Sequence, residues 1–173
     1  MRINLGCGSD IRPGFCNVDS ANLPGVDMVF DLNEFPWPLE NECADEVSII
    51  NVLEHLDDTV RAVEELRRIC RSGALVTLRV PYFNSPDMFA DPTHRRFFSE
   101  RTFDFFDPQR RACQERPYYS PARFGVKVSV VYIRILGVYL PVRKSVLKRL
   151  LLWFGARLPA TVWALEFELK ALR

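Results

Sequence analysis

The residues of this chain that are best suited to chemistry stand directly after short apolar runs in its first half. Four such runs are each followed by glycine or by a polar residue, and the positions concerned are Gly6-Cys7-Gly8, Asp19, Asp31-Leu32 and Asn51. Glycine lets the backbone approach a ligand closely, and a carboxylate accepts hydrogen bonds from ribose hydroxyls or from an exocyclic amine. This combination predicts a site for a cofactor that contains a nucleoside.

A pyrophosphate site is not expected. The dinucleotide-binding pattern G-x-G-x-x-G needs a third glycine where Ile11 stands, and its acidic residue lies about 20 positions onward, whereas Asp19 follows Gly6 by 13. The G-K-S/T sequence of a P-loop is also absent. Residues 1–66 carry 14 Asp and Glu against 3 Lys and Arg, which would repel a phosphate and tolerate a cationic sulfonium.

The rest of the chain has the opposite charge. Residues 67–173 carry 20 Lys and Arg against 8 Asp and Glu, although the net charge of the chain is only +1. This excess suits an anionic substrate, a nucleic acid or a membrane surface, and it also allows the two halves to pair across the fold. Nucleic acid ranks last among these partners, because the basic residues lack the interleaved aromatic side chains of a nucleic-acid platform.

The predicted catalytic residues are His94 and Asp91, three residues before it. A histidine of near-neutral pKa can take the proton of a hydroxyl acceptor as a group is transferred to it, and Asp91 can orient the ring. The alternatives are a structural His94 and a role for Arg95 and Arg96 in holding a substrate carboxylate or phosphate. The pair Glu54-His55 is interpreted as orienting and capping rather than catalytic.

No metal site is predicted from the sequence. The five cysteines are dispersed, form no CxxC pair and have no histidine at ligand spacing. A dispersed set of this kind indicates reduced thiols. Because no apolar run is long enough to span a bilayer and no secretory signal is visible, we expect a cytoplasmic location.

Short β-rich runs and helical patterns alternate along the first half, so we expect an α/β fold in one domain of 173 residues. Asp57–Cys70 predicts a helix, since its apolar residues recur at helical spacing and Gly73 follows as a stop. Leu75–Val80 predicts a strand. An open parallel sheet binds ligands beyond the carboxyl ends of its strands, which is where the polar residues described above stand.

The second half is less regular. Residues 82–123 are rich in Phe, Pro, Arg and Asp and predict a lid-like insertion, with a short helix at Ser99–Phe106. Val126–Leu140 is expected to form one long strand, and Trp163–Leu172 the last strand. Val142–Phe154 predicts a basic amphipathic helix. Its apolar side is expected to pack on the sheet, and the alternative is that the helix lies on an anionic membrane.

Four segments together carry a resemblance to a known family. They are INLGCGSD, VDS, FDLNEFPWPLENECADEVSIINVLEHL and RRICRSGALVTLRVPYF. In this order they resemble the class I S-adenosylmethionine-dependent methyltransferases, and most of all the small methyltransferase type 11-like proteins. The resemblance is close over residues 2–83 and weaker beyond them. It implies a doubly wound, seven-stranded, mostly parallel Rossmann-like sheet with an antiparallel last strand.

The resemblance also implies roles toward S-adenosylmethionine. Gly6-Cys7-Gly8 would lie along the methionine part of the cofactor, and Asp19 would accept hydrogen bonds from the ribose. Asp31-Leu32 would meet the adenine amine and ring, and Asn51-Val52 would lie beside the sulfonium. Asn4 stands where the family often has an acidic residue and is therefore grouped with the cofactor-binding residues.

The function implied by the resemblance is methyl transfer to a small-molecule or glycan acceptor, by direct displacement at the methyl carbon. A first alternative is a non-catalytic S-adenosylmethionine-binding partner subunit, favoured by Asn4 and by the absence of a helix before the first strand. A second is a membrane-surface or nucleic-acid-binding protein on the same fold. The expected partners are the acceptor, a second copy of the chain beside the open cofactor pocket, and a membrane at residues 143–154, but no nucleic acid.

Overall fold

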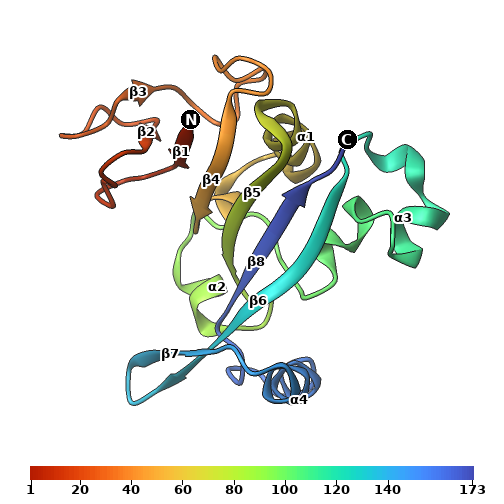
Figure 1. Ribbon diagram of the computed structural model, residues 1–173. Coiled ribbons are helices and arrows are strands. Elements are labelled where there is room, and N and C mark those ends of the chain that lie inside the picture. Colours follow the sequence, from red (N-terminus) through yellow and green to blue (C-terminus); the bar gives the residue numbers. More distant parts are fainter.

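Eight strands form one sheet in the computed structural model, which describes residues 1–173. The order across the sheet is β3-β2-β1-β4-β5-β8-β6-β7 (Figure 1). The strands are β1 (Arg2–Leu5), β2 (Cys16–Asp19), β3 (Met28–Val29), β4 (Ala44–Ile50), β5 (Cys70–Pro81), β6 (Phe124–Ile135), β7 (Val138–Val142) and β8 (Ala164–Ala171). The helices are α1 (Thr59–Ile69), α2 (Pro86–Ala90), α3 (Arg111–Glu115) and α4 (Ser145–Gly155), with 3-10 helices η1 (Leu53–His55), η2 (Thr102–Phe106) and η3 (Pro117–Tyr119).

The expected mostly parallel sheet is confirmed. Strand β1 pairs in parallel with both β2 and β4, so the strand order reverses beside β1. Strand β8 runs antiparallel between β5 and β6. The strand count is eight rather than seven, because the predicted long strand turns back at Leu136 and Gly137. Both residues have positive φ angles, 50° and 83°, which suit a two-residue hairpin between β6 and β7.

Helix α1 packs against one face of the sheet through residues at helical spacing. Its buried positions include Ala62, Val63, Leu66 and Ile69. Asp58 caps its start by accepting a hydrogen bond from the Arg61 amide at 3.0 Å. The predicted end at Cys70 is confirmed to within one residue, but Gly73 does not act as the stop, because the helix passes directly into β5 at Cys70 and Gly73 lies within that strand.

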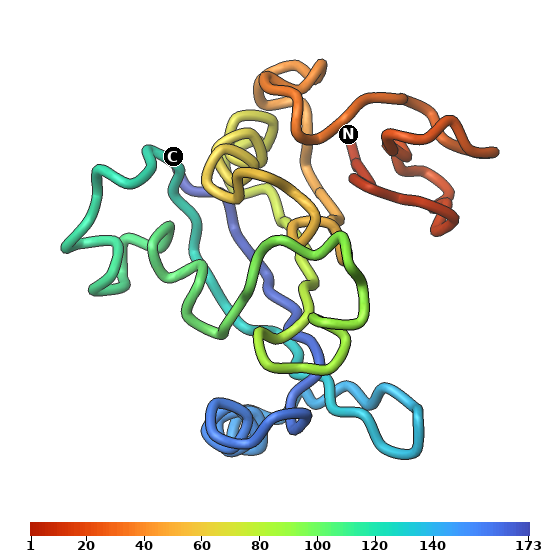
Figure 2. The backbone as a smooth tube through the Cα atoms, turned by 180° about the vertical axis from the view of Figure 1, so that it is seen from behind, coloured from red at the N-terminus to blue at the C-terminus, as the bar shows by residue number.

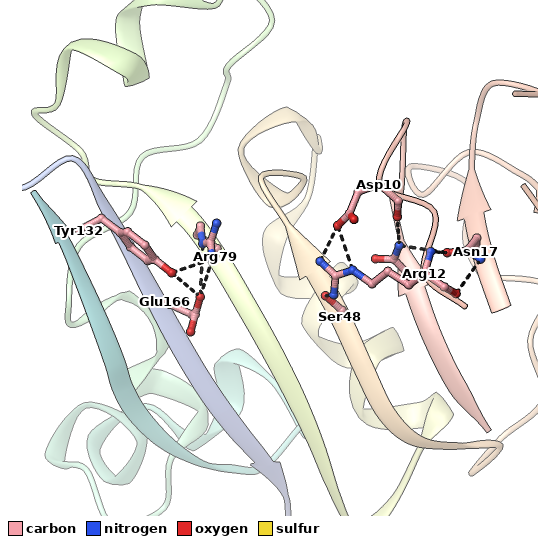
Figure 3. A network of polar contacts seen from close by, with 8 residues as sticks. Asp10, Arg12, Asn17, Ser48, Arg79, Tyr132 and Glu166 are labelled. Carbon is pink, nitrogen blue, oxygen red and sulfur yellow. Dashed lines mark hydrogen bonds and ion pairs between the residues drawn. The ribbon is translucent and has the colours of Figure 1, made fainter. Parts of the chain in front are cut away.

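The opposite face of the sheet carries polar side chains. Figure 3 shows this face toward the viewer, with the helices behind it. Arg79 donates to Glu166 at 2.8 Å and to the Tyr132 hydroxyl at 2.6 Å, and its guanidinium lies 4.5 Å from the centre of the Tyr132 ring. Figure 2, seen from behind, shows α1 (yellow) in front of the sheet. The crossovers that precede β4 contain no helix, which explains why this face is polar rather than apolar.

The first crossover is held by polar contacts instead of a helix. The amide of Asn4 donates to the Asp10 carbonyl at 2.7 Å, and Asn17 Oδ1 accepts from the Arg12 backbone at 2.9 Å. Arg12 then spans to the Ser48 hydroxyl on β4 at 2.5 Å and to Asp10 at 2.6 Å (Figure 3). These contacts fix the backbone that leads from β1 into β2.

The insertion over residues 82–123 packs its apolar side chains into the core. Met88, Phe98, Phe103, Phe106 and Cys113 are all buried. The helix predicted at Ser99–Phe106 is shorter, the 3-10 helix η2. The insertion therefore forms a wall of the molecule, and its first part lies beyond the carboxyl ends of β4 and β5.

Helix α4 packs on the sheet through a face that is partly polar. Lys148 points inward and donates to the Val128 and Ser129 carbonyls, beside the bulge in β6, at 2.7 and 3.0 Å. Leu151 and Leu152 are partly buried against the core, whereas Val146 and Leu150 are 83% and 52% exposed. The expected packing of the apolar side on the sheet is therefore confirmed for only part of that side. None of the helices has the length and apolar character needed to cross a membrane.

Candidate active site

A first hollow, which we call the cofactor hollow, lies at the carboxyl ends of β1, β2 and β4. Its volume is about 260 Å³. Its lining consists of Gly6, Asp19, Ser20, Asp31, Leu32, Asn33, Asn51, Val52, His55 and Leu56. The structure therefore brings together six of the residues predicted from the strand ends, at the point where the strand order reverses.

The two strand-end aspartates are held by backbone donors. Asp19 accepts from the Gly8 amide at 2.7 Å and from the Ala21 amide at 3.0 Å. Asp31 accepts from the Asn33 amide at 2.8 Å. Each carboxylate oxygen has two lone pairs, so both side chains keep acceptor capacity toward the hollow. This donor set fits the hydroxyls of a ribose and the amine of a purine.

Gly6 and Val52 form the tightest contact in the cofactor hollow. Gly6 has φ +62°, and a Cβ atom placed on it would lie 2.3 Å from Val52 Cγ2. Only glycine allows β1 to end in this conformation beside Val52. Asn51 also has a positive φ, 54°, a conformation that asparagine adopts more readily than most residues.

Three of the predicted cofactor residues lie outside this lining. Asn4 uses its amide to hold the first crossover, as described above. The Cys7 side chain is buried, and burial raises the pKa of its thiol. Gly8 contributes its amide to Asp19 rather than to the hollow. These three residues therefore support the lining of the cofactor hollow and are not part of it.

A second hollow, which we call the acceptor hollow, adjoins the first. Its volume is about 400 Å³. It is lined by Asn51, Glu54, His55, Arg79, Pro81, Asp87, Asp91, His94, Tyr132, Tyr139, Trp163 and Ala164. Asn51 and His55 belong to both linings, so the two hollows meet at the end of β4.

The predicted catalytic pair lies in the acceptor hollow. His94 Nε2 is 4.0 Å from Asp91 Oδ2, and the His94 side chain is only 9% exposed. His94 Nδ1 lies 3.1 Å from the Met88 carbonyl, which accepts its proton and leaves Nε2 with a lone pair. Hydrogen bonds from Thr93 lower the pKa of Asp91.

Sequence reasoning missed the close approach of Glu54 and His55 to His94. The rings of His55 and His94 lie 4.7 Å apart, edge to face. Glu54 is 1% exposed, and neither of its carboxylate oxygens has a hydrogen-bond partner. Burial, together with the smaller effect of the Asp91 charge, raises the pKa of Glu54 to about 8. Burial and the nearby His94 lower the pKa of His55.

The two arginines after His94 are directed away from the acceptor hollow. Arg95 pairs with the Asp57 carboxylate, and Arg96 contacts the carbonyls of Asp57 and Leu56. Their amides both donate to the Glu54 carbonyl, at 2.7 and 3.2 Å. The arginines thus tie the insertion to η1, and neither lines the hollow where they were considered as anion ligands.

Aromatic side chains form the far wall of the acceptor hollow. Tyr139 of β7 and Trp163 approach each other with ring centres 6.1 Å apart. The Tyr139 hydroxyl is hydrogen-bonded to Asp87, and burial together with this bond raises the pKa of Tyr139 to about 12. The wall offers flat apolar faces edged by carboxylates.

Comparison with known proteins agrees with this arrangement. Residues 4–78 match the family model of a methyltransferase domain. A methyltransferase dependent on S-adenosylmethionine from Archaeoglobus fulgidus is similar with a TM-score of 0.62 at 15% identity, over 98% of this chain and 85% of that chain. One from Thermotoga maritima gives 0.60 at 12% identity, over 98% and 80% of the two chains. One from Aquifex aeolicus gives 0.53 at 12% identity, over 99% and 81%.

No curated protein sequence matches the chain. The family model runs from within β1 to within β5 and so includes every residue of the cofactor hollow. The structural likenesses extend over nearly the whole chain. Residues 4–78 are therefore similar to a methyltransferase domain, and the chain has the fold of the S-adenosylmethionine-dependent methyltransferases.

Proposed function

We propose that this protein transfers a methyl group from S-adenosylmethionine to a hydroxyl group of a glycan or small-molecule acceptor bound in the acceptor hollow. The observation that supports this most is the junction of the two hollows at Asn51 and His55. A donor in one hollow and an acceptor in the other would meet there. Alignment of two reactants in one site supplies much of the rate of a displacement reaction.

The residues of the cofactor hollow fit the donor and would orient it. Asp19 and Asp31 would accept from its ribose and its adenine amine, and Leu32 would contact the ring. When bound, S-adenosylmethionine supplies a methyl carbon that forms a bond to the acceptor oxygen as its bond to sulfur breaks. Asn51 backbone and side chain would line the path between the hollows.

The acceptor hydroxyl must lose its proton as the new bond forms. We assign the removal of this proton to His94 and Asp91, which lie together at one end of the acceptor hollow. His94 Nε2 has a lone pair that can take the proton. Asp91 Oδ2 lies 4.0 Å from this atom, and its negative charge would stabilise the protonated ring. The products balance as a methyl ether, S-adenosylhomocysteine and one proton held by this pair.

The chemistry of the hollow supports a ring-shaped, polyhydroxylated or aromatic acceptor. Tyr132, Tyr139 and Trp163 would contact the body of such a molecule. Arg79 lies over one face of Tyr132, and Arg134 lies over one face of each of the other two rings. Asp87 and Asp91 offer acceptors for its hydroxyl groups. Arg79 is neutralised by Glu166, so the hollow is not built for a strongly anionic group.

The experiment that tests this assignment compares wild type with Tyr139→Ala in methyl transfer to a panel of soluble sugars and glycan fragments. Release of S-adenosylhomocysteine measures turnover. Tyr139→Ala should raise the KM for the acceptor about tenfold or more, as expected for loss of a buried aromatic contact. Its affinity for S-adenosylmethionine should not change, because Tyr139 does not line the cofactor hollow. An unchanged acceptor KM would place the acceptor elsewhere.

A second observation concerns where the protein acts. Helix α4 and the β6–β7 hairpin lie at one end of the molecule (Figure 1). Leu136 at the hairpin tip is 99% exposed, and Trp153 on α4 is 54% exposed. Residues 116–165 contain nine Lys and Arg and no Asp or Glu, although Asp87 contacts Arg134 of the hairpin. Exposed apolar side chains in a mainly basic segment match an anionic membrane, so we propose that this end rests on one.

Sedimentation with lipid vesicles tests the membrane contact. The double variant Leu150→Ser/Trp153→Ser should bind phosphatidylglycerol-containing vesicles about tenfold or more weakly than wild type, since two side chains no longer enter the lipid. The matched control is Tyr118→Ser on η3, which is 78% exposed but lies away from α4. Equal binding by the double variant, or equal binding to purely zwitterionic vesicles, would contradict the proposal.

A further inference from the structure

Three potential metal ligands converge at the inner end of the acceptor hollow. They are Glu54 and His55 of η1 and His94 of the insertion, and one ligand atom from each lies within 4.8 Å of the others. All three residues line the hollow. Two of them are adjacent in the sequence, and the third is 39 positions later, so only the fold brings the set together.

In the neutral form of each ring, the hydrogen bonds made by Nδ1 leave Nε2 of both histidines without a proton. His94 Nδ1 must carry its proton, because its neighbour at 3.1 Å is the Met88 carbonyl, which can only accept. Thr93 Oγ1 donates its own proton to Asp91 at 2.6 Å and therefore accepts from His55 Nδ1 at 2.8 Å. A second hydrogen bond of this kind, which fixes the tautomer and the ring, accompanies nearly all metal-binding histidines.

The Glu54 carboxylate has no counter-charge from the protein. It is 1% exposed, and both oxygens lack a partner. Arg79 of the same hollow is paired with Glu166, and Arg95 and Arg96 are paired with Asp57 and with backbone carbonyls. Burial without a partner disfavours the charged form of this carboxyl group, and a bound cation would supply the missing partner.

We propose that Glu54, His55 and His94 bind one divalent ion of the first transition series, such as zinc, iron(II) or manganese. Two histidines and one carboxylate form a facial ligand set that leaves further positions free. The acceptor hollow lies on that side. Because ligand atoms around one such ion lie closer than 4.8 Å, the three side chains draw together on binding.

This inference rests on the proposed function for its chemical role. A hydroxyl of the acceptor would occupy a free position on the ion, which lowers the pKa of that hydroxyl. The O–H bond then breaks with its proton passing to Asp91, 4.0 Å from His94 Nε2. The oxygen forms its bond to the methyl carbon as the carbon–sulfur bond breaks. His94 would thus serve as a ligand and Asp91 as the proton acceptor.

Titration of chelator-treated protein with Co²⁺, followed by calorimetry and by visible absorption, tests the metal site itself. Wild type should bind one Co²⁺ per chain with a d–d spectrum and no sulfur-to-cobalt charge-transfer band. Glu54→Gln and His94→Ala should weaken this binding more than 100-fold. Thr93→Val, which removes only the group that orients His55, should weaken it about 10- to 100-fold. The control Glu168→Gln removes an exposed carboxylate elsewhere and should bind normally.

Titration of the same proteins with S-adenosylmethionine separates the two proposals. Binding of S-adenosylmethionine without Co²⁺ binding overturns the metal site alone. Co²⁺ binding that is unchanged in Glu54→Gln and His94→Ala, or that shows a thiolate band, also overturns it. Co²⁺ binding at this cluster in a protein that does not bind S-adenosylmethionine leaves the metal site standing and removes the proposed methyl transfer.

Discussion

Replacing His94 with alanine is expected to lower kcat for methyl transfer by about 10²- to 10⁴-fold, the usual contribution of a positioned proton-transfer group. The same loss is expected if His94 acts through a bound ion, since the substitution removes a ligand. The dissociation constant for S-adenosylmethionine should stay within about twofold of wild type, because His94 does not line the cofactor hollow. Single-turnover kinetics and calorimetry measure the two quantities.

The companion variant for this result is Asp91→Asn. It keeps the shape of the side chain and its bonds to Thr93 but removes the charge beside His94. Its kcat should fall by about tenfold, less than that of His94→Ala. If His94→Ala retained kcat within a few-fold of wild type while folded, the acceptor would not react beside His94.

Gly6→Ala should cost the protein both stability and cofactor affinity. Alanine at φ +62° is strained by about 1–2 kcal/mol. Its Cβ would also lie 2.3 Å from Val52 Cγ2, so the two segments must move apart, at about 1–3 kcal/mol. Since Val52 lines the cofactor hollow, affinity for S-adenosylmethionine should fall about tenfold or more.

Gly73→Ala is the matched control, because it shares the strain without the collision and lies in β5 outside the cofactor hollow. Gly73 has φ +86°, and nothing lies within 4 Å of a Cβ placed on it. This variant should lose about 2–8 °C in Tm and keep its affinity for S-adenosylmethionine. Equal effects of the two substitutions on cofactor binding would show that the contact between Gly6 and Val52 does not shape the hollow.

The cofactor hollow was accessible to sequence reasoning because parallel strands end at one edge of a sheet. Asp19, Asp31 and Asn51 each follow a short apolar run, so their place was set by local patterns and one topological rule. The same reasoning wrongly gave Gly73 the role of ending the helix. The chain enters β5 at Cys70, which pairs with Ala44, so Gly73 lies within a strand.

The acceptor hollow was less accessible because its residues meet only through long-range packing. Nothing local in the sequence indicates that Glu54 is buried without a partner or that His55 touches His94. The inward position of Lys148 on α4 was missed for a similar reason. An amphipathic pattern identifies two faces, but it does not show that carbonyls beside the bulge in β6 accept hydrogen bonds from this lysine.

Calorimetric titration with S-adenosylmethionine, on wild type, Asp19→Ala and Asp10→Ala, tests the central claim most directly. Asp19 lines the cofactor hollow, whereas Asp10 is an exposed carboxylate of the same crossover that does not. Wild type and Asp10→Ala should bind saturably, and Asp19→Ala should lose about 1–3 kcal/mol, roughly 5- to 150-fold in affinity. No binding by wild type at millimolar ligand, or equal affinity in Asp19→Ala, would contradict the assignment of the cofactor site.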